Sequence, residues 1–457
     1  MVELLKAIDD VSKKKLNVSD LLDIIVREAF ERKASDIHME ARQGNNLLIR
    51  YRIDGMLRDI VTIGNNLEES ILFIIKVRAK LRTDIHFAPQ DGKILFSFKN
   101  EDLDFRKTEF KKEEESKDEK KKESKEEELK DEEKEEEVKT PKEPVEEYRK
   151  IDARISILPV TFGEKVVIRL LSQTNRSFGL ADLGFEPDDL EKIEASYREP
   201  YGLILSTGPT GSGKTTTLYS ILKILNTREV NITTIEDPVE YNIVGVNHIQ
   251  INTKSDLTFA NGLRSILRQD PNIIMVGEIR DTETARITVN SALTGHLVLS
   301  TVHANDAISA IPRLIDMGIE PFLIASTLNI IISQRLARRL CDNCKTEYVI
   351  GKEEEHKDML KLRPDLGKYL NTTDKLYKAN GCSQCDNTGY SGRIGLYEIL
   401  KTNKEIRDVI ITSPTTDNIY AAAKKHGFKL MIEDGIFKLK KGLIDLEELI
   451  RVIAIKE

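Results

Sequence analysis

The chain has 457 residues, of which 40% are hydrophobic, and its formal net charge is −7. This length is too great for one hydrophobic core and predicts three or four folded units. The apolar stretches, such as Ile71 to Ile75, are far shorter than the roughly 18 to 20 residues that cross a bilayer, and the N-terminus lacks a signal-peptide segment. We therefore expect a cytosolic protein. The negative net charge argues weakly against extended nucleic-acid binding.

Residues 1–175 have the pattern of a small α+β domain. A helix is expected from about Asp20 to Lys33, with Ser19 as its N-cap. Alternating polar and apolar residues then predict strands at Asn46 to Ile53, around Leu57 to Ile63 and at Gly92 to Phe98.

A highly charged segment interrupts this domain. From Lys111 to Thr140 the sequence holds 15 acidic and 10 basic residues and no apolar stripe that would dock a helix. We expect disorder or a solvated helix over about residues 104–147, rather than a partner-binding tail. Ile151 to Leu158 and Glu164 to Leu171 then alternate around a turn and predict a hairpin that completes the same sheet. Residues 176–187 are expected to form a linker.

Residues 208–215 read Gly-Pro-Thr-Gly-Ser-Gly-Lys-Thr, which is a complete P-loop between an apolar run and a helix-like segment. The loop's backbone N–H groups are expected to bind the phosphates of ATP, with Lys214 at the β- and γ-phosphate oxygens and the Thr215 hydroxyl on Mg²⁺. A chance glycine-rich turn is the weaker alternative, because the flanking strand and helix are both present. The candidate nucleotide-binding residues are Gly208, Pro209, Thr210, Gly211, Ser212, Gly213, Lys214, Thr215 and Thr216.

Around this loop, residues 188–339 predict a parallel sheet with crossover helices. The strand candidates are Leu203 to Ser206, Ile232 to Ile235, Ile273 to Val276 and Leu297 to Thr301. Polar or charged residues follow each run, at the edge where open α/β sheets bind ligands.

Acidic residues follow two of these strands. The run that ends at Glu278 has the shape of a Walker B strand, although Gly277 stands where many P-loop enzymes have aspartate. Asp237 and Glu240, after the preceding strand, can supply the missing carboxylate toward Mg²⁺ and the attacking water. The alternative is that these acids cap helices or lie on the surface.

Two Cys-x-x-Cys pairs, separated by 37 residues, have zinc-site spacing. The pairs are Cys341 with Cys344 and Cys382 with Cys385. Four thiolates predict a closed structural zinc site, in a module over residues 340–395 that precedes a helical region at 396–457. Thiol redox chemistry is the alternative, but neither pair has a thioredoxin-like context. The arginines between Gln334 and Arg339 lack interleaved aromatic residues, which favours a structural or interface contact over nucleic-acid binding.

Taken together, the motifs resemble the type II secretion and type IV pilus assembly ATPase family. The similarity covers nearly the whole chain outside the charged segment. The matching segments are Ala34 to His38, Arg52 to Gly55, Gln90 to Gly92, Leu158-Pro159, Gly163-Glu164, the P-loop, an Asp box at Ile235 to Glu240, a Walker B at Gly277 to Asp281, and a His box from Thr294 to His303.

The resemblance implies an α/β fold: a RecA-like P-loop ATPase domain preceded by a PAS-like α+β domain, with a small zinc module and a helical C-terminal region. It also implies a homo-hexameric ring. Arg154 and Arg169 match arginines that reach the nucleotide and act as arginine fingers, whereas isolated strand arginines more often face solvent. His296 and His303 match sensors of the nucleotide state near the subunit interface, although histidines alone are more often core residues.

The same resemblance implies a cytoplasmic motor at the inner membrane. Hydrolysis of Mg-ATP would turn a polytopic inner-membrane platform protein that adds pilin or pseudopilin subunits to a filament. The tetracysteine module favours assembly or secretion over pilus retraction, since retraction ATPases generally lack it. One departure is that only 18 residues precede Ser19, where assembly ATPases usually have a further domain. A DNA-uptake or translocation motor and a non-catalytic scaffold are the other candidates, and intact catalytic motifs disfavour the scaffold.

Overall fold

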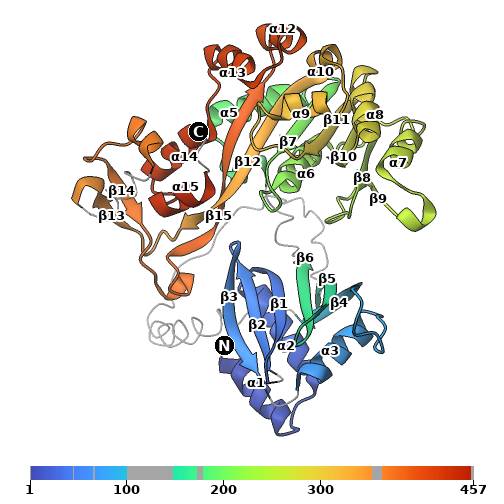
Figure 1. Ribbon diagram of the computed structural model, residues 1–457, viewed down its shortest axis with the longest axis vertical. Coiled ribbons are helices and arrows are strands. Elements are labelled where there is room, and N and C mark those ends of the chain that lie inside the picture. The colour runs from blue at the N-terminus through green and yellow to red at the C-terminus, as the bar shows by residue number, and fades with distance from the viewer. Residues whose placement is uncertain are drawn as a thin grey trace, which may run out of the picture. The chain divides into compact units, whose positions relative to one another are not determined.

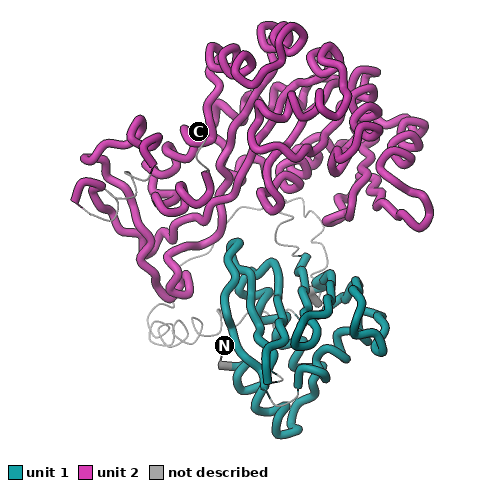
Figure 2. Tube along the Cα trace, in the orientation of Figure 1, with its two compact units in different colours: residues 1–174 teal, residues 175–457 magenta. Residues whose placement is uncertain are grey.

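The structure is a computed structural model that describes residues 2–44, 46–64, 67–99, 148–171, 179–352 and 363–453. The chain forms two compact units, Met1–Thr174 and Asn175–Glu457 (Figure 2). The charged segment expected to be disordered, at about residues 104–147, and the start of the linker expected at 176–187 lie outside the described residues.

A six-stranded antiparallel sheet with the order β3-β2-β1-β6-β5-β4 organises the first unit, and three helices accompany it among the residues that the structure describes (Figure 1). The strands are β1 (Ala34–Arg42), β2 (Asn46–Ile53), β3 (Met56–Ile63), β4 (Gln90–Lys99), β5 (Tyr148–Val160) and β6 (Gly163–Leu171). The helices are α1 (Val2–Ser12), α2 (Val18–Glu31) and α3 (Leu67–Arg78). Strands β5 and β6 form the expected hairpin, and β5 pairs with β4 as far as Lys99 and Tyr148.

The N-terminal helices differ from the expectation. Helix α2 begins at Val18, with Asn17 as an N-cap that makes no side-chain hydrogen bond, so Ser19 lies inside the helix and does not cap it. Packing sets this start, because Val18 already contacts the hydrophobic core. Helix α1 was not expected at all. It buries Leu4, Ala7 and Val11, which follow the spacing of one helix face.

A seven-stranded sheet with the order β15-β12-β7-β11-β10-β8-β9 organises the second unit (Figure 1). All neighbouring strands are parallel except β15, which is antiparallel to β12. The strands are β7 (Gly202–Thr207), β8 (Ile232–Glu236), β9 (Asn247–Gln250), β10 (Ile273–Ile279), β11 (Leu297–Val302), β12 (Leu328–Leu340) and β15 (Tyr390–Lys401). The four parallel strands expected from the sequence are therefore present.

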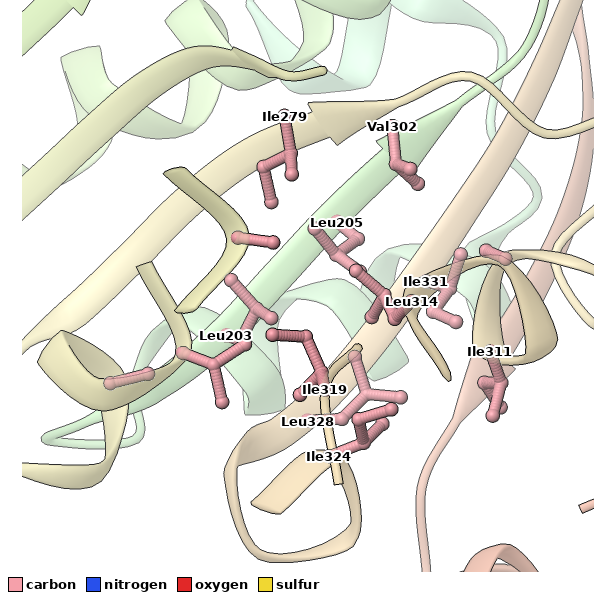
Figure 3. Close-up of a cluster of buried hydrophobic side chains, with 14 of the residues drawn as sticks. Leu203, Leu205, Ile279, Val302, Ile311, Leu314, Ile319, Ile324, Leu328 and Ile331 are labelled. Carbon is pink, nitrogen blue, oxygen red and sulfur yellow. The ribbon is translucent and has the colours of Figure 1, made fainter. Parts of the chain in front are cut away.

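Helices cover both faces of this sheet, so its central strands are buried on both sides. The helices are α5 (Pro187–Tyr197), α6 (Lys214–Leu225), α7 (Phe259–Ile266), α8 (Thr282–Leu293), α9 (Ala310–Asp316), α10 (Pro321–Thr327), α12 (Lys404–Thr412), α13 (Thr416–Lys425), α14 (Met431–Lys440) and α15 (Leu446–Val452). On one face, Leu203 and Leu205 of β7 pack with side chains of α8, α9 and α10, as Figure 3 shows for part of this core. On the other face, Ile204 packs with α5 and α6. This alternation fixes β7 and the loop that follows it.

The cysteine-containing region is an excursion from this sheet. The chain leaves at the end of β12, forms the two-stranded sheet of β13 (Thr346–Val349) and β14 (Lys375–Lys378), and returns as β15. The boundary expected between residues 395 and 396 falls inside β15, because the buried run from Leu396 to Leu400 pairs with β12 rather than beginning a helix. The C-terminal helices α14 and α15 share a hydrophobic cluster with Ala337 of β12.

Candidate nucleotide-binding and catalytic site

The glycine-rich loop connects β7 to α6 in a conformation that its glycines make possible. Gly208, Gly211 and Gly213 have φ angles of +140°, +79° and +92°, which side chains other than glycine rarely adopt. A Cβ atom on Gly208 would lie 2.3 Å from the carbonyl oxygen of Gln334. The loop therefore lies against β12 so closely that only glycine fits at its first position.

The loop residues fit a bound triphosphate. Lys214 donates hydrogen bonds to the carbonyl oxygens of Gly208 and Pro209, at 2.9 and 3.0 Å, so its ammonium group lies over the loop. Thr215 and Thr216 form the first turn of α6, where backbone N–H groups and the helix dipole favour an anion. Within the described part of the chain, the buried hydroxyl of Ser212 has no hydrogen-bond partner. Such an unpaired polar group in a glycine-lined cradle is what a phosphate oxygen would satisfy.

Gln334, on β12, holds the P-loop in place through hydrogen bonds. The sequence predicted only a structural or interface contact for the segment from Gln334 to Arg339. Its side-chain amide donates to the Ser212 carbonyl oxygen at 2.8 Å, and its oxygen accepts a hydrogen bond from the Thr217 hydroxyl at 2.8 Å. The side chain is almost fully buried. Gln334 thus joins the loop and the first turns of α6 to a strand that follows them by more than 100 residues. The sequence carries no signal for this role of Gln334, because the close contact between Gly208 and the Gln334 backbone depends on the fold.

One arginine lies between two acidic residues, Glu278 near the end of β10 and Asp237 directly after β8. Arg280 donates to Glu278 at 2.6 Å, and its guanidinium nitrogen lies 3.8 Å from a carboxylate oxygen of Asp237. His303, after β11, lies 3.2 Å from the other carboxylate oxygen of Glu278. The structure therefore brings Asp237, Glu278 and His303 together at the carboxyl edge of the sheet, next to the P-loop. Arg280 was not among the predicted site residues, although it falls within the Walker B segment.

Charge dominates the environment of Glu278. Burial raises the pKa of this carboxyl group, but the hydrogen bonds and charges of Arg280 and His303 outweigh burial and hold the pKa below its usual value. Burial lowers the pKa of Lys214, and the negative charge of Glu278 opposes that shift. Glu278 is thus an anion within electrostatic reach of Lys214, as a group that organises Mg²⁺ beside the phosphates must be.

The close approach of β8 to β10 gives a physical reason for the glycine at position 277. A Cβ atom there would lie 3.3 Å from the Glu236 Cα atom and from the Ile235 carbonyl oxygen. For any larger residue, the β8 backbone would have to give by a few tenths of an ångström. The carboxylate that is absent at position 277 is instead available beside the neighbouring strand β8, since Asp237 directly follows that strand and Glu240 lies in the same loop.

The two candidate histidines lie at opposite edges of the sheet. His303 follows the carboxyl end of β11, whereas His296 precedes its amino end and accepts a backbone hydrogen bond from Gly202, the first residue of β7. The His296 ring hydrogen-bonds to the carbonyl oxygen of Ser291 at 2.9 Å. The fold of one chain therefore separates His296 from the P-loop.

The two candidate arginines belong to the first unit. Arg154 of β5 and Arg169 of β6 are direct cross-strand partners. Arg169 donates to Asp36 at 3.0 Å, and Arg52 lies 3.5 Å from the same carboxylate group. This sheet face carries three arginines in register, two of which, Arg52 and Arg169, contact the buried Asp36. It therefore has the positive charge that a phosphate-binding surface requires.

The four cysteines converge on one point. Their sulfur atoms all lie within 4.8 Å of one another, with separations of 3.9 Å for Cys341–Cys382 and 3.8 Å for Cys344–Cys385. Burial raises the pKa of the Cys385 thiol, but the backbone N–H groups of Cys382 and Gly389, each 3.2 Å from its sulfur, outweigh burial and lower the pKa. Four converging sulfurs with N–H donors to a thiolate are positioned to bind a metal ion.

Comparisons with known proteins agree with this geometry. Residues 11–111 and 144–451 match the family described as type II/IV secretion system protein. The chain is 39% identical over 432 residues to the type IV pilus assembly ATPase PilB of Thermus thermophilus, covering 93% of this chain but 42% of that protein. It is 38% identical over 450 residues to type II secretion system protein E of Aeromonas hydrophila, covering 98% of this chain and 77% of that protein.

Solved structures show a similar fold. The ATPase DotB of Legionella pneumophila has a TM-score of 0.60 at 20% identity, with 94% of each chain covered. The pilus retraction motor PilT with bound ADP has a TM-score of 0.57 at 24% identity, covering 95% of this chain and 96% of that one. The expected α/β ATPase fold is thereby confirmed, whereas the PAS-like assignment stays a prediction. Among the described residues, no helix combines the length and apolarity that a membrane crossing demands.

Proposed function

The chain belongs to the type II/IV secretion system protein family, and on that premise we propose that it is a hexameric ATPase that powers type IV pilus assembly. The observation that carries the proposal is the gathering of Asp237, Glu278 and His303 beside the P-loop. Hydrolysis of Mg-ATP is the reaction, and movement between the two units is its mechanical product. An inner-membrane platform protein would receive this movement and add pilin subunits to a filament.

Each site residue has a proposed role. When bound, Mg²⁺ would neutralise charge on the β- and γ-phosphates. Thr215 would bind that ion, and Asp237 and Glu278 would hold it directly or through water. Glu240 would accept the proton of the attacking water. Lys214 would bind the β- and γ-phosphate oxygens and orient them.

Two arginines and two histidines also have proposed roles. Arg154 and Arg169 would neutralise the charge that develops on the γ-phosphate, and would transmit its presence to the rest of that unit. His303 would sense the nucleotide through Glu278. His296 would act at the interface with a neighbouring subunit, because the fold of its own chain separates it from the P-loop.

We also propose that the four cysteines bind one structural Zn²⁺ ion. Two Cys-x-x-Cys pairs and the convergence of their sulfurs support zinc over other metals, because tetrahedral thiolate sites favour it. Such a closed site leaves no position for catalysis. Its role would be to fix the excursion between β12 and β15.

Type II secretion is a second candidate, because its ATPases are as similar to this chain as the pilus ATPases are. Replacing the chromosomal gene with a Lys214→Ala allele tests both. Loss of surface pili with secretion intact supports pilus assembly, whereas loss of exported enzymes with pili intact supports type II secretion. If DNA stimulates hydrolysis by the purified protein, and neither pili nor secretion is affected, the protein is instead a nucleic-acid motor.

A further inference from the structure

A buried hydrogen-bond cluster lies directly behind the candidate catalytic acids. The Tyr219 hydroxyl on α6 donates to Glu236 at 2.5 Å, and the Thr234 hydroxyl donates to the other carboxylate oxygen at 2.6 Å. His248 on β9 lies 3.0 Å from that same oxygen. Glu236 and Tyr219 are almost completely buried. Glu236 therefore has no access to substrate, and its hydrogen bonds serve the structure around it.

The hydrogen bonds of His248 define its state in this cluster. Its Nε2 atom accepts a hydrogen bond from the backbone N–H of Ile243 at 3.0 Å, so the proton of the neutral ring is on Nδ1. Nδ1 then donates toward Glu236. The carboxylate thus has three donors, which come from α6, β8 and β9. A carboxylate held by three donors fixes the end of β8. The segment Asp237–Glu240, which we call the acidic loop, begins directly after it.

Tyr219 contacts the residues that flank the segment Asp237–Glu240. Its hydroxyl group donates to Glu236 on one side, and its ring packs edge-on against Tyr241 on the other, with centroids 4.8 Å apart. Asp237 and Glu240 lie between these two contacts in the sequence. Burial and the charge of Glu236 raise the pKa of Tyr219, whereas the backbone N–H of Glu240 acts in the opposite direction. The tyrosine oxygen therefore also lies next to the Glu240 backbone.

The tyrosine belongs to the P-loop helix. It follows Lys214 by five residues, which is about one and a half helical turns or roughly 7.5 Å along the axis. The same helix thus begins at the P-loop and contacts the residues on both sides of Asp237 and Glu240. We propose that Tyr219 is a positioning residue, which sets the distance between Glu240 and the γ-phosphate held by the P-loop. This inference rests on the proposed role of Glu240 as the general base.

Tyr219→Phe tests the proposal, because it removes the hydroxyl group and keeps the ring. We expect kcat for ATP hydrolysis to fall by about tenfold or more, since small errors in placing a reacting group cost up to about 100-fold in rate. The KM for ATP and the affinity for a fluorescent ATP analogue should change by less than about twofold, because the P-loop contacts remain. Glu236→Gln should produce the same separation of kcat from KM.

The matched control is Tyr397→Phe. Tyr397 is buried in the same hydrophobic cluster and its hydroxyl donates to the Leu183 carbonyl oxygen, with no link to the acidic loop. This variant should lose a similar amount of thermal stability and keep its kcat. Equal effects of Tyr219→Phe and Tyr397→Phe on kcat, or a kcat of Tyr219→Phe within twofold of wild type, would overturn the proposal.

A double variant separates this inference from the function on which it rests. In a Glu240→Gln background, Tyr219→Phe should lower the residual rate by less than about twofold, because the group that it positions is already inactive. An additive loss would show that Tyr219 acts elsewhere. If Glu240→Gln hydrolyses ATP normally, the base assignment itself fails. If Glu240→Gln is inactive and Tyr219→Phe is normal, only the positioning role fails.

Discussion

The candidate nucleotide site, at the carboxyl ends of the strands of the seven-stranded sheet, and the cysteine cluster are organised in opposite ways. At the nucleotide edge, residues from β7, β8, β10, β11 and β12 meet, and several groups keep charge or hydrogen-bonding capacity for a ligand. In the cysteine cluster, two short segments supply four sulfurs that converge on one point. The first arrangement leaves the nucleotide site open to substrate, whereas the second leaves no open position in the cysteine cluster. Substitutions should therefore stop chemistry at one site and alter local structure at the other.

Removing the proposed base should have the largest effect. Glu240→Gln keeps the shape of the side chain and removes its charge, so hydrolysis should fall by about 100-fold or more while ATP binding persists. Lys214→Ala should weaken binding as well. Steady-state hydrolysis and equilibrium binding of a fluorescent ATP analogue measure both. Normal hydrolysis by Glu240→Gln together with an inactive, ATP-binding Glu278→Gln would reverse the roles of the two acids.

Disrupting the cysteine cluster should affect local structure rather than ATP hydrolysis. Cys382→Ser should abolish zinc binding, and structural zinc sites supply about 10 to 16 kcal/mol of apparent binding energy, so the excursion between β12 and β15 should unfold locally. The core around β7 should survive, because its side chains lie outside this region. Elemental analysis should find one zinc per wild-type chain and none in the variant. Metal-free wild-type protein purified without chelator would refute the zinc site.

Replacing Gln334, which supports the P-loop, should have an intermediate effect on ATP hydrolysis. Gln334→Leu removes both hydrogen bonds to the P-loop region and leaves the Ser212 carbonyl and Thr217 hydroxyl without these partners. An unsatisfied buried polar group costs about 1 to 3 kcal/mol, so the KM for ATP should rise by about tenfold. Arg339→Leu, at an exposed position of the same strand, serves as the control. An unchanged KM in Gln334→Leu would show that the glycines alone hold the loop.

The charged segment should give the smallest effect. Lys99 and Tyr148 are the outermost paired residues of β4 and β5, so a short turn can join the two strands. Replacing Lys111 to Thr140 with a short Gly/Ser loop should leave hydrolysis within about twofold, because loop-closure entropy depends only weakly on length. The measurement is the rate per chain of protein that still assembles. A large loss in assembled protein would assign the segment a role in the proposed hexamer.

The difference between the two sites also explains what the sequence could predict. The P-loop and the cysteine pairs are local patterns, and buried apolar runs predicted β7, β8, β10 and β11. Gln334, Arg280 and Tyr219 were missed because their roles depend on contacts between strands and helices far apart in the chain. His296 and His303 flank β11 in the sequence, and the direction of that strand places them at its opposite ends, so their predicted roles beside the nucleotide and at a subunit interface stay predictions.

The contact between Gln334 and Ser212 also has a consequence for biosynthesis. The two residues are 122 positions apart, so the glutamine leaves the ribosome long after the loop that it holds. At about 5 to 20 residues per second, this interval lasts roughly 6 to 24 seconds. The first unit ends at Thr174 and can fold before synthesis of that loop begins. A nascent chain stopped before β12 should therefore contain a folded first unit and no assembled nucleotide site.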